Sequence, residues 1–166
     1  MTTLQVLTWG DTRLKVENLD VGDWSPELDR LVADMFETMV AQEGAGLAAP
    51  QVGMNINLAV IDVTSEPAGK RMILINPEII REEGQQLGSE GCLSIPGITE
   101  MVNRPMKVWV KNRKPDGTWE EIEAEGLAAR AVSHEIDHLR GRLFVERLGP
   151  VKQGIVRRKY QKLRKG

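Results

Sequence analysis

The sequence predicts an α+β fold in which a mixed, largely antiparallel sheet packs around a central helix, with a further helix towards each end of the chain. Three observations support this prediction. An amphipathic helical pattern fills residues 25–44, short β-rich runs follow it, and a second helical pattern covers residues 127–139. Because the β-rich runs do not alternate with helices, antiparallel pairing is favoured over a parallel sheet.

The first predicted helix begins after Ser25, which can cap it, and Pro26 suits its first turn. Gly44 is expected to stop it. The segment carries an apolar stripe made of Leu28, Leu31, Val32, Met35, Phe36, Met39 and Val40.

The β-rich runs contain many β-branched and aromatic residues, which are enriched in strands. They cover residues 56–63, 71–80, 106–112 and 118–125. The last run alternates strictly from Trp119 to Ala124, and the sequence KPDGT at residues 114–118 is typical of a hairpin turn between the last two runs.

The second predicted helix runs from Leu127 to Leu139, with Gly141 beyond its end. At about 100° per residue it shows three sectors. One narrow stripe carries Leu127, Ala131, His134 and His138. An adjacent apolar stripe carries Ala128, Val132, Ile136 and Leu139. The third sector is expected to meet solvent or polar loops, and it carries Arg130, Ser133, Asp137 and Arg140.

Length and composition favour one compact domain over residues 1–166. The chain has 166 residues, is 41% hydrophobic and has a formal net charge of −2, which argues against a general nucleic-acid binder and gives no reason to expect DNA as a partner. We expect a cytoplasmic protein without a membrane segment, because no apolar signal or spanning run is present. Cys92 is the one cysteine, so no disulfide can form within the chain.

The sequence HEIDH at residues 134–138 places two histidines four residues apart on a helix, where both imidazoles can reach one metal ion. Glu135 lies beside them and suits a general base acting on water. Cys92 is a candidate third ligand, which would leave a tetrahedral ion one open position for water. The plainer alternatives are two hydrogen-bonded histidines and a buried cysteine that only fills space.

A third stretch, GAGLAAPQVG at residues 44–53, combines small residues with Gln51. Its glycines and alanines would let a substrate backbone approach closely, and the Gln51 amide can donate a hydrogen bond to an oxygen. A flexible turn after a helix is the alternative interpretation of this stretch.

Together GAGLAAPQ, EGCLS at residues 90–94 and HEIDH resemble, in order and spacing, the three motifs of the peptide deformylase family. The resemblance extends from about Leu14 to Phe144. It implies an α+β fold with a metal between the central helix and a sheet, in a single catalytic domain. It also implies hydrolysis of the N-formyl group from nascent peptides that begin with formylmethionine, with release of formate. Fe²⁺ is the metal expected in the cell, and Zn²⁺, Ni²⁺ and Co²⁺ are the alternatives in purified protein.

The resemblance also assigns roles to individual residues. The metal ligands would be Cys92, His134 and His138, and Glu135 would be the general base and acid. The oxyanion would receive hydrogen bonds from the Gln51 amide and the Leu93 backbone N–H. The residues expected to pair with the substrate backbone are Ala45, Gly46 and Gly91.

Two positions depart from the family pattern. Ser133 stands where glutamine is usual before the first histidine, and we expect changed packing around the ligands without loss of a ligand. WGDTRL at residues 9–14 replaces a proline-containing opening. Two other functions stay open: a metalloprotease with the same histidine spacing, and a non-catalytic metal-binding protein of deformylase-like fold.

The C-terminal segment, about residues 151–166, contains basic residues and no acidic one. Val156, Tyr160 and Leu163 share one helical face, so an amphipathic helix could dock through them with its basic side outward. A solvated surface helix is the plain interpretation. Basic C-terminal helices in the family are associated with the ribosome, which predicts a weak, salt-dependent contact with ribosomal RNA.

Overall fold

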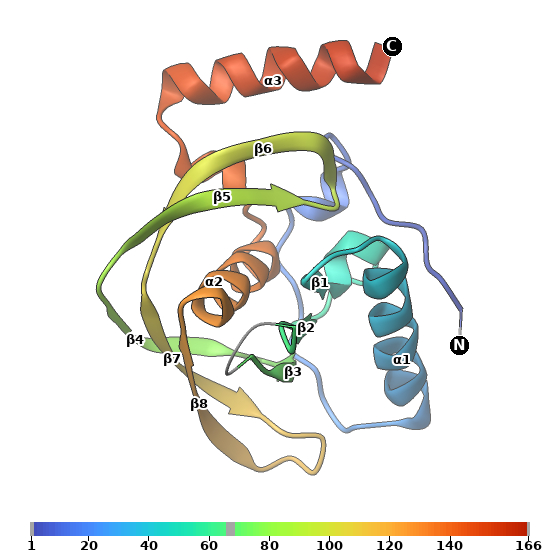
Figure 1. Cartoon of the computed structure of the whole chain (residues 1–166). Helices are drawn as coiled ribbons and strands as arrows, with labels where there is room; N and C mark the ends of the chain where they lie inside the picture. Colours follow the sequence, from blue (N-terminus) through green and yellow to red (C-terminus); the bar gives the residue numbers. More distant parts are fainter. Residues whose placement is uncertain (1, 66–68, 166) are drawn as a thin grey trace.

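The computed structural model describes residues 2–65 and 69–165. Its longer helices are α1 (Pro26–Ala41), α2 (Leu127–Leu139) and α3 (Pro150–Lys165), and short 3-10 turns lie at Thr12–Leu14, Ala49–Val52 and Phe144–Arg147. In Figure 1, α2 lies at the centre of the molecule, with α1 on one side and α3 beyond the curved pair of strands β5 and β6. The α+β prediction with a central helix is therefore confirmed.

The strands form three small sheets whose neighbours all pair antiparallel. One sheet contains β1 (Gly46–Ala48), β2 (Leu58–Asp62) and β3 (Arg71–Ile75). The second contains β4 (Glu78–Glu83), β7 (Lys107–Arg113) and β8 (Trp119–Glu125). The third is the hairpin of β5 (Gln86–Cys92) and β6 (Ile95–Arg104).

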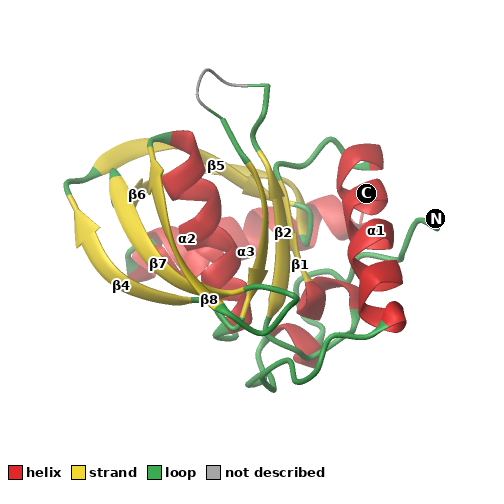
Figure 2. Ribbon diagram, turned by 90° about the horizontal axis from the view of Figure 1, so that it is seen from below, coloured by secondary structure: helices red, strands yellow, loops and turns green. Residues whose placement is uncertain are grey.

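The first sheet lies between the two predicted helices, as Figure 2 shows. Side chains of β2 alternate between its faces: Ala59 and Ile61 pack in the cluster around α2, and Leu58 and Val60 pack in the cluster around α1. Because all four side chains are completely buried, this strand fixes the position of both helices.

Helix α1 begins as predicted, since the Ser25 side chain accepts a hydrogen bond from the backbone N–H of Leu28. The centre of its apolar stripe is buried, including Met35 and Met39. Val40 was predicted to belong to the apolar stripe, but it lies in the last turn of α1 and is 65% exposed.

Two strand predictions need correction. The run at residues 71–80 is not one strand: Asn76 has a positive φ of 48°, and the chain passes from β3 to β4 in a different sheet. The hairpin β5–β6 lies outside the predicted strand runs. Its strands bury charged residues such as Glu90 and Arg104, so they lack the alternation of apolar and polar residues that marks a strand.

The prediction that the polar sector of α2 meets solvent or polar loops is also wrong for three of its four residues. Arg130, Ser133 and Asp137 are buried, with exposures of 7%, 1% and 6%, and they face β5 and β6 instead of solvent. Arg140 alone among the four is exposed. These side chains can be buried because the hairpin supplies opposite charges: Arg104 pairs with Asp137, and Glu90 pairs with Arg130.

Helix α3 docks on β6 through Val156 and Tyr160, which are 0% and 4% exposed. Trp9, in the N-terminal segment that differs from the family pattern, packs against Tyr160 with tilted rings whose centroids lie 5.3 Å apart. Its backbone N–H donates to the carbonyl of Ser94 at 2.8 Å. Within residues 2–65 and 69–165, the helices are too short or too polar to cross a membrane.

Candidate metal and catalytic site

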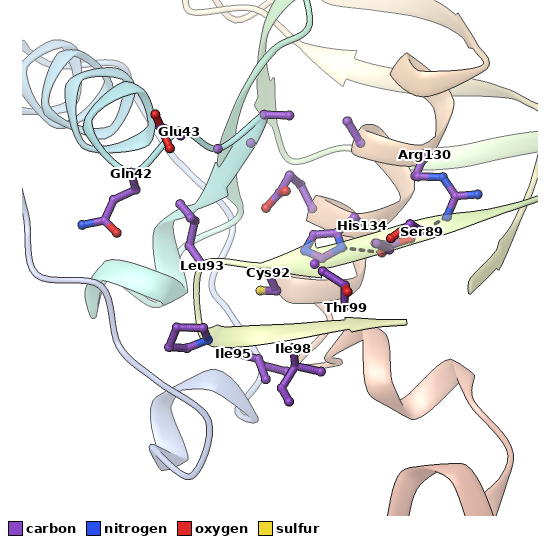
Figure 3. Close-up of a pocket in the computed structure, with 18 of the residues that line it drawn as sticks. Gln42, Glu43, Ser89, Cys92, Leu93, Ile95, Ile98, Thr99, Arg130 and His134 are labelled. Carbon is purple, nitrogen blue, oxygen red and sulfur yellow. Dashed lines mark hydrogen bonds and ion pairs between the residues drawn. The ribbon is translucent and has the colours of Figure 1, made fainter. Parts of the chain in front are cut away.

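Helix α2 and the end of β5 bring the lone cysteine to the paired histidines. Cys92 Sγ lies 3.2 Å from His138 Nε2, which in turn lies 3.2 Å from His134 Nε2. The three donor atoms all lie within 4.8 Å of one another. Figure 3 shows Cys92 and His134 lying close together among the residues that line the pocket. Cys92 and His138, 46 positions apart in the sequence, thus meet at one point.

This donor set fits a transition-metal ion. A thiolate and two imidazoles are ligands that zinc and iron accept, and their spacing leaves room for one ion between them. His134 Nδ1 contacts Glu90 Oε1 at 2.5 Å, which directs the lone pair of Nε2 towards Cys92 and His138. Burial lowers the pKa of His138 well below its usual value, so this imidazole is neutral and able to bind metal.

Glu135 lies on the same helix between the two histidines and is 3% exposed. Its Oε1 atom is buried without a hydrogen-bond partner among the described residues. Burial raises the pKa of Glu135 to about 7. The carboxylate fits only because Gly46 has no side chain: a Cβ on Gly46 would lie 2.5 Å from Glu135 Oε2. The Glu135 carboxylate thus packs against β1, and Glu135 lines the pocket.

Gln51 lies behind the cysteine, fixed at both ends of its amide. Its Oε1 accepts a hydrogen bond from the Ala48 backbone at 2.9 Å, and its Nε2 lies 3.0 Å from Ser94 Oγ and 3.6 Å from Cys92 Sγ. These contacts assign the amide orientation and point its N–H₂ group at the cysteine side of the site. The Leu93 backbone follows Cys92 directly and lines the same pocket.

Beneath the histidines, a chain of ion pairs, buried except for Arg147 at its end, joins the hairpin β5–β6 to α2. Arg104 pairs with both Glu90 and Asp137, Arg130 pairs with Glu90, and Arg147 pairs with Asp137. Burial would raise the pKa of Glu90, but hydrogen bonds from His134 and Arg104 hold it well below its usual value. Burial would likewise raise the pKa of Asp137, and hydrogen bonding to Arg147 with the charge of Arg104 lowers it. Both carboxylates are therefore ionised.

A cavity of about 670 Å³ opens over these groups. It is bounded by β1 and β5, each of which lies at an edge of its sheet. The carbonyl of Ala45 accepts a hydrogen bond from Asp62 of β2, so the backbone groups of Gly46, the next residue, face the free edge. An extended peptide could therefore pair with the strand edges on either side of the cavity.

The structure gathers the residues singled out by sequence in one place. Eight of them line the cavity: Ala45, Gly46, Gln51, Gly91, Cys92, Leu93, His134 and Glu135. His138 lies behind them and is 1% exposed. Sequence reasoning missed Glu90, Arg104 and Arg130, although Glu90 stands in the EGCLS motif. A glutamate there, two positions before the candidate ligand Cys92, was the available signal.

Comparison with known proteins gives the same family. The model of the polypeptide deformylase family matches residues 3–154. A peptide deformylase structure from Legionella pneumophila is 40% identical with a TM-score of 0.91, over 99% of this chain and 96% of that one.

Two structures in complex with actinonin are also similar. The peptide deformylase from Ehrlichia chaffeensis is 34% identical with a TM-score of 0.89, over 98% of each chain. The one from Synechococcus elongatus is 38% identical with a TM-score of 0.87, over 96% of this chain and 88% of that one. The chain therefore belongs to the polypeptide deformylase family, whose members are hydrolases.

Proposed function

We propose that this chain is a metal-dependent hydrolase that removes the N-formyl group from peptides beginning with formylmethionine and releases formate. The observation that carries this proposal is the meeting of Cys92, His134 and His138 beside a buried glutamate at the floor of a peptide-sized cavity. The metalloprotease alternative loses support, because the third donor beside the two histidines is the upstream Cys92.

The ligands of the ion would be Cys92 Sγ, His134 Nε2 and His138 Nε2. Such an ion supplies Lewis acidity, which polarises a carbonyl and lowers the pKa of water. Glu135 would take the proton of the attacking water and pass it to the departing amine of the peptide. Gln51 Nε2 and the Leu93 backbone N–H would donate hydrogen bonds to the oxyanion that develops on the formyl group.

The donor set is compatible with several divalent ions. We propose Fe²⁺ as the metal in the cell, with Zn²⁺, Ni²⁺ or Co²⁺ as alternatives in purified protein, since thiolate and imidazole accept all of them. An iron-loaded enzyme would lose activity in air, because Cys92 is partly exposed and its thiolate is open to oxidation.

Substrate binding would use the two strand edges around the cavity. The backbones of Ala45, Gly46 and Gly91 would lie along the peptide, with Gly46 offering the groups that face the free edge of β1. Pairing through backbone groups does not read side chains, so nascent polypeptides of many sequences would be accepted beyond the first residue.

A formate-release assay tests the proposed reaction. Protein prepared without oxygen and loaded with Fe²⁺ or Ni²⁺ should release formate from formyl-Met-Ala-Ser. Glu135→Gln should keep its metal and lose turnover by about 10²- to 10⁴-fold, because the proton acceptor is gone. The exposed Glu78→Gln serves as the matched control and should retain full turnover. Full turnover in Glu135→Gln would remove the assigned base.

We further propose that the chain acts in the cytoplasm as one catalytic unit and that α3 attracts it weakly to ribosomal RNA. Deleting α3 is a poor test, because Val156 and Tyr160 are part of the core. Reversing the exposed charges of Arg158, Lys159 and Lys162 to glutamate leaves that packing in place.

The charge-reversed variant should co-sediment with ribosomes less than the parent at low salt, and the difference should vanish at high salt. Its formate release from a formylated tripeptide should not change. Equal co-sedimentation of parent and variant at low salt would contradict the ribosome contact.

A further inference from the structure

The N-terminal segment lies between α3 and the candidate site, and part of it departs from the family pattern. Residues 2–9, which we call the N-terminal strap, run from the side of α1 to the tip of the hairpin β5–β6 (Figure 1). We propose that Trp9 is a positioning residue, which holds Ser94 and through it the amide of Gln51. This inference rests on the proposed function, in which Gln51 donates a hydrogen bond to the oxyanion.

The backbone of the strap is bonded to both residues. Leu7 N–H donates to the carbonyl of Gln51 at 2.7 Å, and Trp9 N–H donates to the carbonyl of Ser94 at 2.8 Å. Gln51 lies in the 3-10 turn after β1, and Ser94 lies in the turn between β5 and β6. One short segment therefore spans the two turns and fixes one relative to the other.

Ser94 connects the strap to the amide that would act on the oxyanion. Its hydroxyl accepts a hydrogen bond from Gln51 Nε2 at 3.0 Å, and the two residues are 0% and 1% exposed. The same Nε2 lies 3.6 Å from Cys92 Sγ, so a shift of Ser94 would move the amide relative to the candidate ligand. A displacement of about 1 Å at such a group can cost about 10²-fold in rate.

The indole of Trp9 anchors this end of the strap on α3. It packs on Tyr160 with ring centroids 5.3 Å apart, and the guanidinium carbon of Arg157 lies 5.1 Å from the centre of the indole. Arg157 and Tyr160 are three residues apart on one helix, so they present a single surface to the ring. Tyr160 is buried in the cluster that contains Val156 and Phe144, which fixes that surface. Trp9 thus contacts α3 through its side chain and Ser94 through its backbone.

A tight turn presents Trp9 to α3. Asp11 N–H donates to the carbonyl of Thr8 at 3.0 Å, which closes the turn with Trp9 and Gly10 at its centre. Gly10 has a φ of 109°, which a proline cannot adopt because its ring fixes φ near about −65°. The departure of this segment from a proline-containing opening is therefore part of the arrangement that places Trp9.

The test compares Trp9→Ala with Trp24→Ala. Trp24 is a matched control, because it is also partly buried but packs in the cluster around α1. Trp9→Phe is the conservative variant, since its ring can still stack on Tyr160. For each metal-loaded protein, kcat and KM are measured on formyl-Met-Ala-Ser, and folding is checked by circular dichroism.

A second measurement does not depend on activity. The rate at which the side-chain amide protons of Gln51 exchange with solvent is followed by nuclear magnetic resonance on the Zn²⁺-loaded protein. The signals are assigned by their loss in Gln51→Ala. Because Gln51 is buried, this rate reports how firmly its amide is held.

In Trp9→Ala we expect kcat to fall about tenfold while KM stays within about twofold, because the oxyanion develops only in the transition state. The Gln51 amide protons should exchange about tenfold faster or more. Trp9→Phe should keep at least about half of the parent kcat. Trp24→Ala should match the parent in both measurements. Parent values in Trp9→Ala, or equal changes in Trp24→Ala, would overturn the positioning role.

A double-mutant cycle tests whether Trp9 acts through Gln51. Gln51→Ala alone should lower kcat by about 10²- to 10³-fold. Adding Trp9→Ala should lower it by less than about a further twofold, because the amide that Trp9 positions is already gone. A further loss of about tenfold in the double variant would show that Trp9 acts by another route and would overturn the inference.

Trp9→Leu keeps the inference testable if Trp9→Ala does not fold. It retains apolar volume against α3 but lacks the ring, so kcat should lie below that of Trp9→Phe and Gln51 exchange should be faster. Values equal to those of Trp9→Phe would overturn the role of the indole. Failure of the parent protein to release formate would contradict the proposed function instead, and the exchange rates would still test whether Trp9 holds Gln51.

Discussion

At the scale of single residues, the site depends on buried charged groups that form ion pairs with one another. Glu90 and Asp137 are ionised under α2, and leaving either unpaired would cost several kcal/mol. Sequence reasoning found the histidines and Glu135 because a spacing of four on a helix places two side chains on one face. It could not find Arg104, because nothing in the local pattern shows that a residue far along the chain faces Asp137.

Gly46 offers a sharp test at this scale. Gly46→Ala places a Cβ 2.5 Å from Glu135 Oε2, so the carboxylate must move. A displacement of about 1 Å at a reacting group can cost about 10²-fold, so we expect kcat to fall by roughly that factor while metal content stays the same. Gly22→Ala is the control, since no atom lies within 4 Å of its Cβ position. Wild-type kcat in Gly46→Ala would contradict the placement of Glu135.

At the scale of elements, α2 and the hairpin β5–β6 are joined by charge as well as by apolar contact. Sequence periodicity predicted α1, α2 and the hairpin β7–β8, where apolar residues repeat with the period of the element. It failed for β5 and β6, whose inward residues include Glu90 and Arg104. It also failed for the polar sector of α2, because the oppositely charged residues that stabilise the buried Arg130 and Asp137 come from another element.

Asp137→Asn tests this connection between elements. The substitution keeps the shape of the side chain but leaves Arg104 and Arg147 without their shared carboxylate. We expect the free energy of unfolding to fall by about 3 kcal/mol or more, measured by urea denaturation of the metal-loaded protein. Asp23→Asn, at an exposed position before α1, should change it by less than about 0.5 kcal/mol. Equal stabilities of the two variants would show that the ion pairs do not hold α2.

At the scale of the whole molecule, elements from distant parts of the chain each supply one part of the site. Helix α2 contributes the histidines and Glu135, β5 contributes Cys92, and the turn after β1 contributes Gln51. The hydrophobic clusters on either side of β2 hold these elements in fixed positions relative to one another. The family resemblance predicted that these residues lie together in one site, whereas periodicity alone predicted only some of the helices and strands that carry them.

The proposed function depends most on one metal ion bound by Cys92, His134 and His138, and Co²⁺ substitution measures this binding directly. The Co²⁺-loaded protein should bind one ion per chain and show a near-ultraviolet charge-transfer band from thiolate to metal. Cys92→Ser should abolish that band, and His134→Ala should lower Co²⁺ affinity. Survival of the band in Cys92→Ser, or the absence of stoichiometric Co²⁺ binding by the parent, would contradict the account.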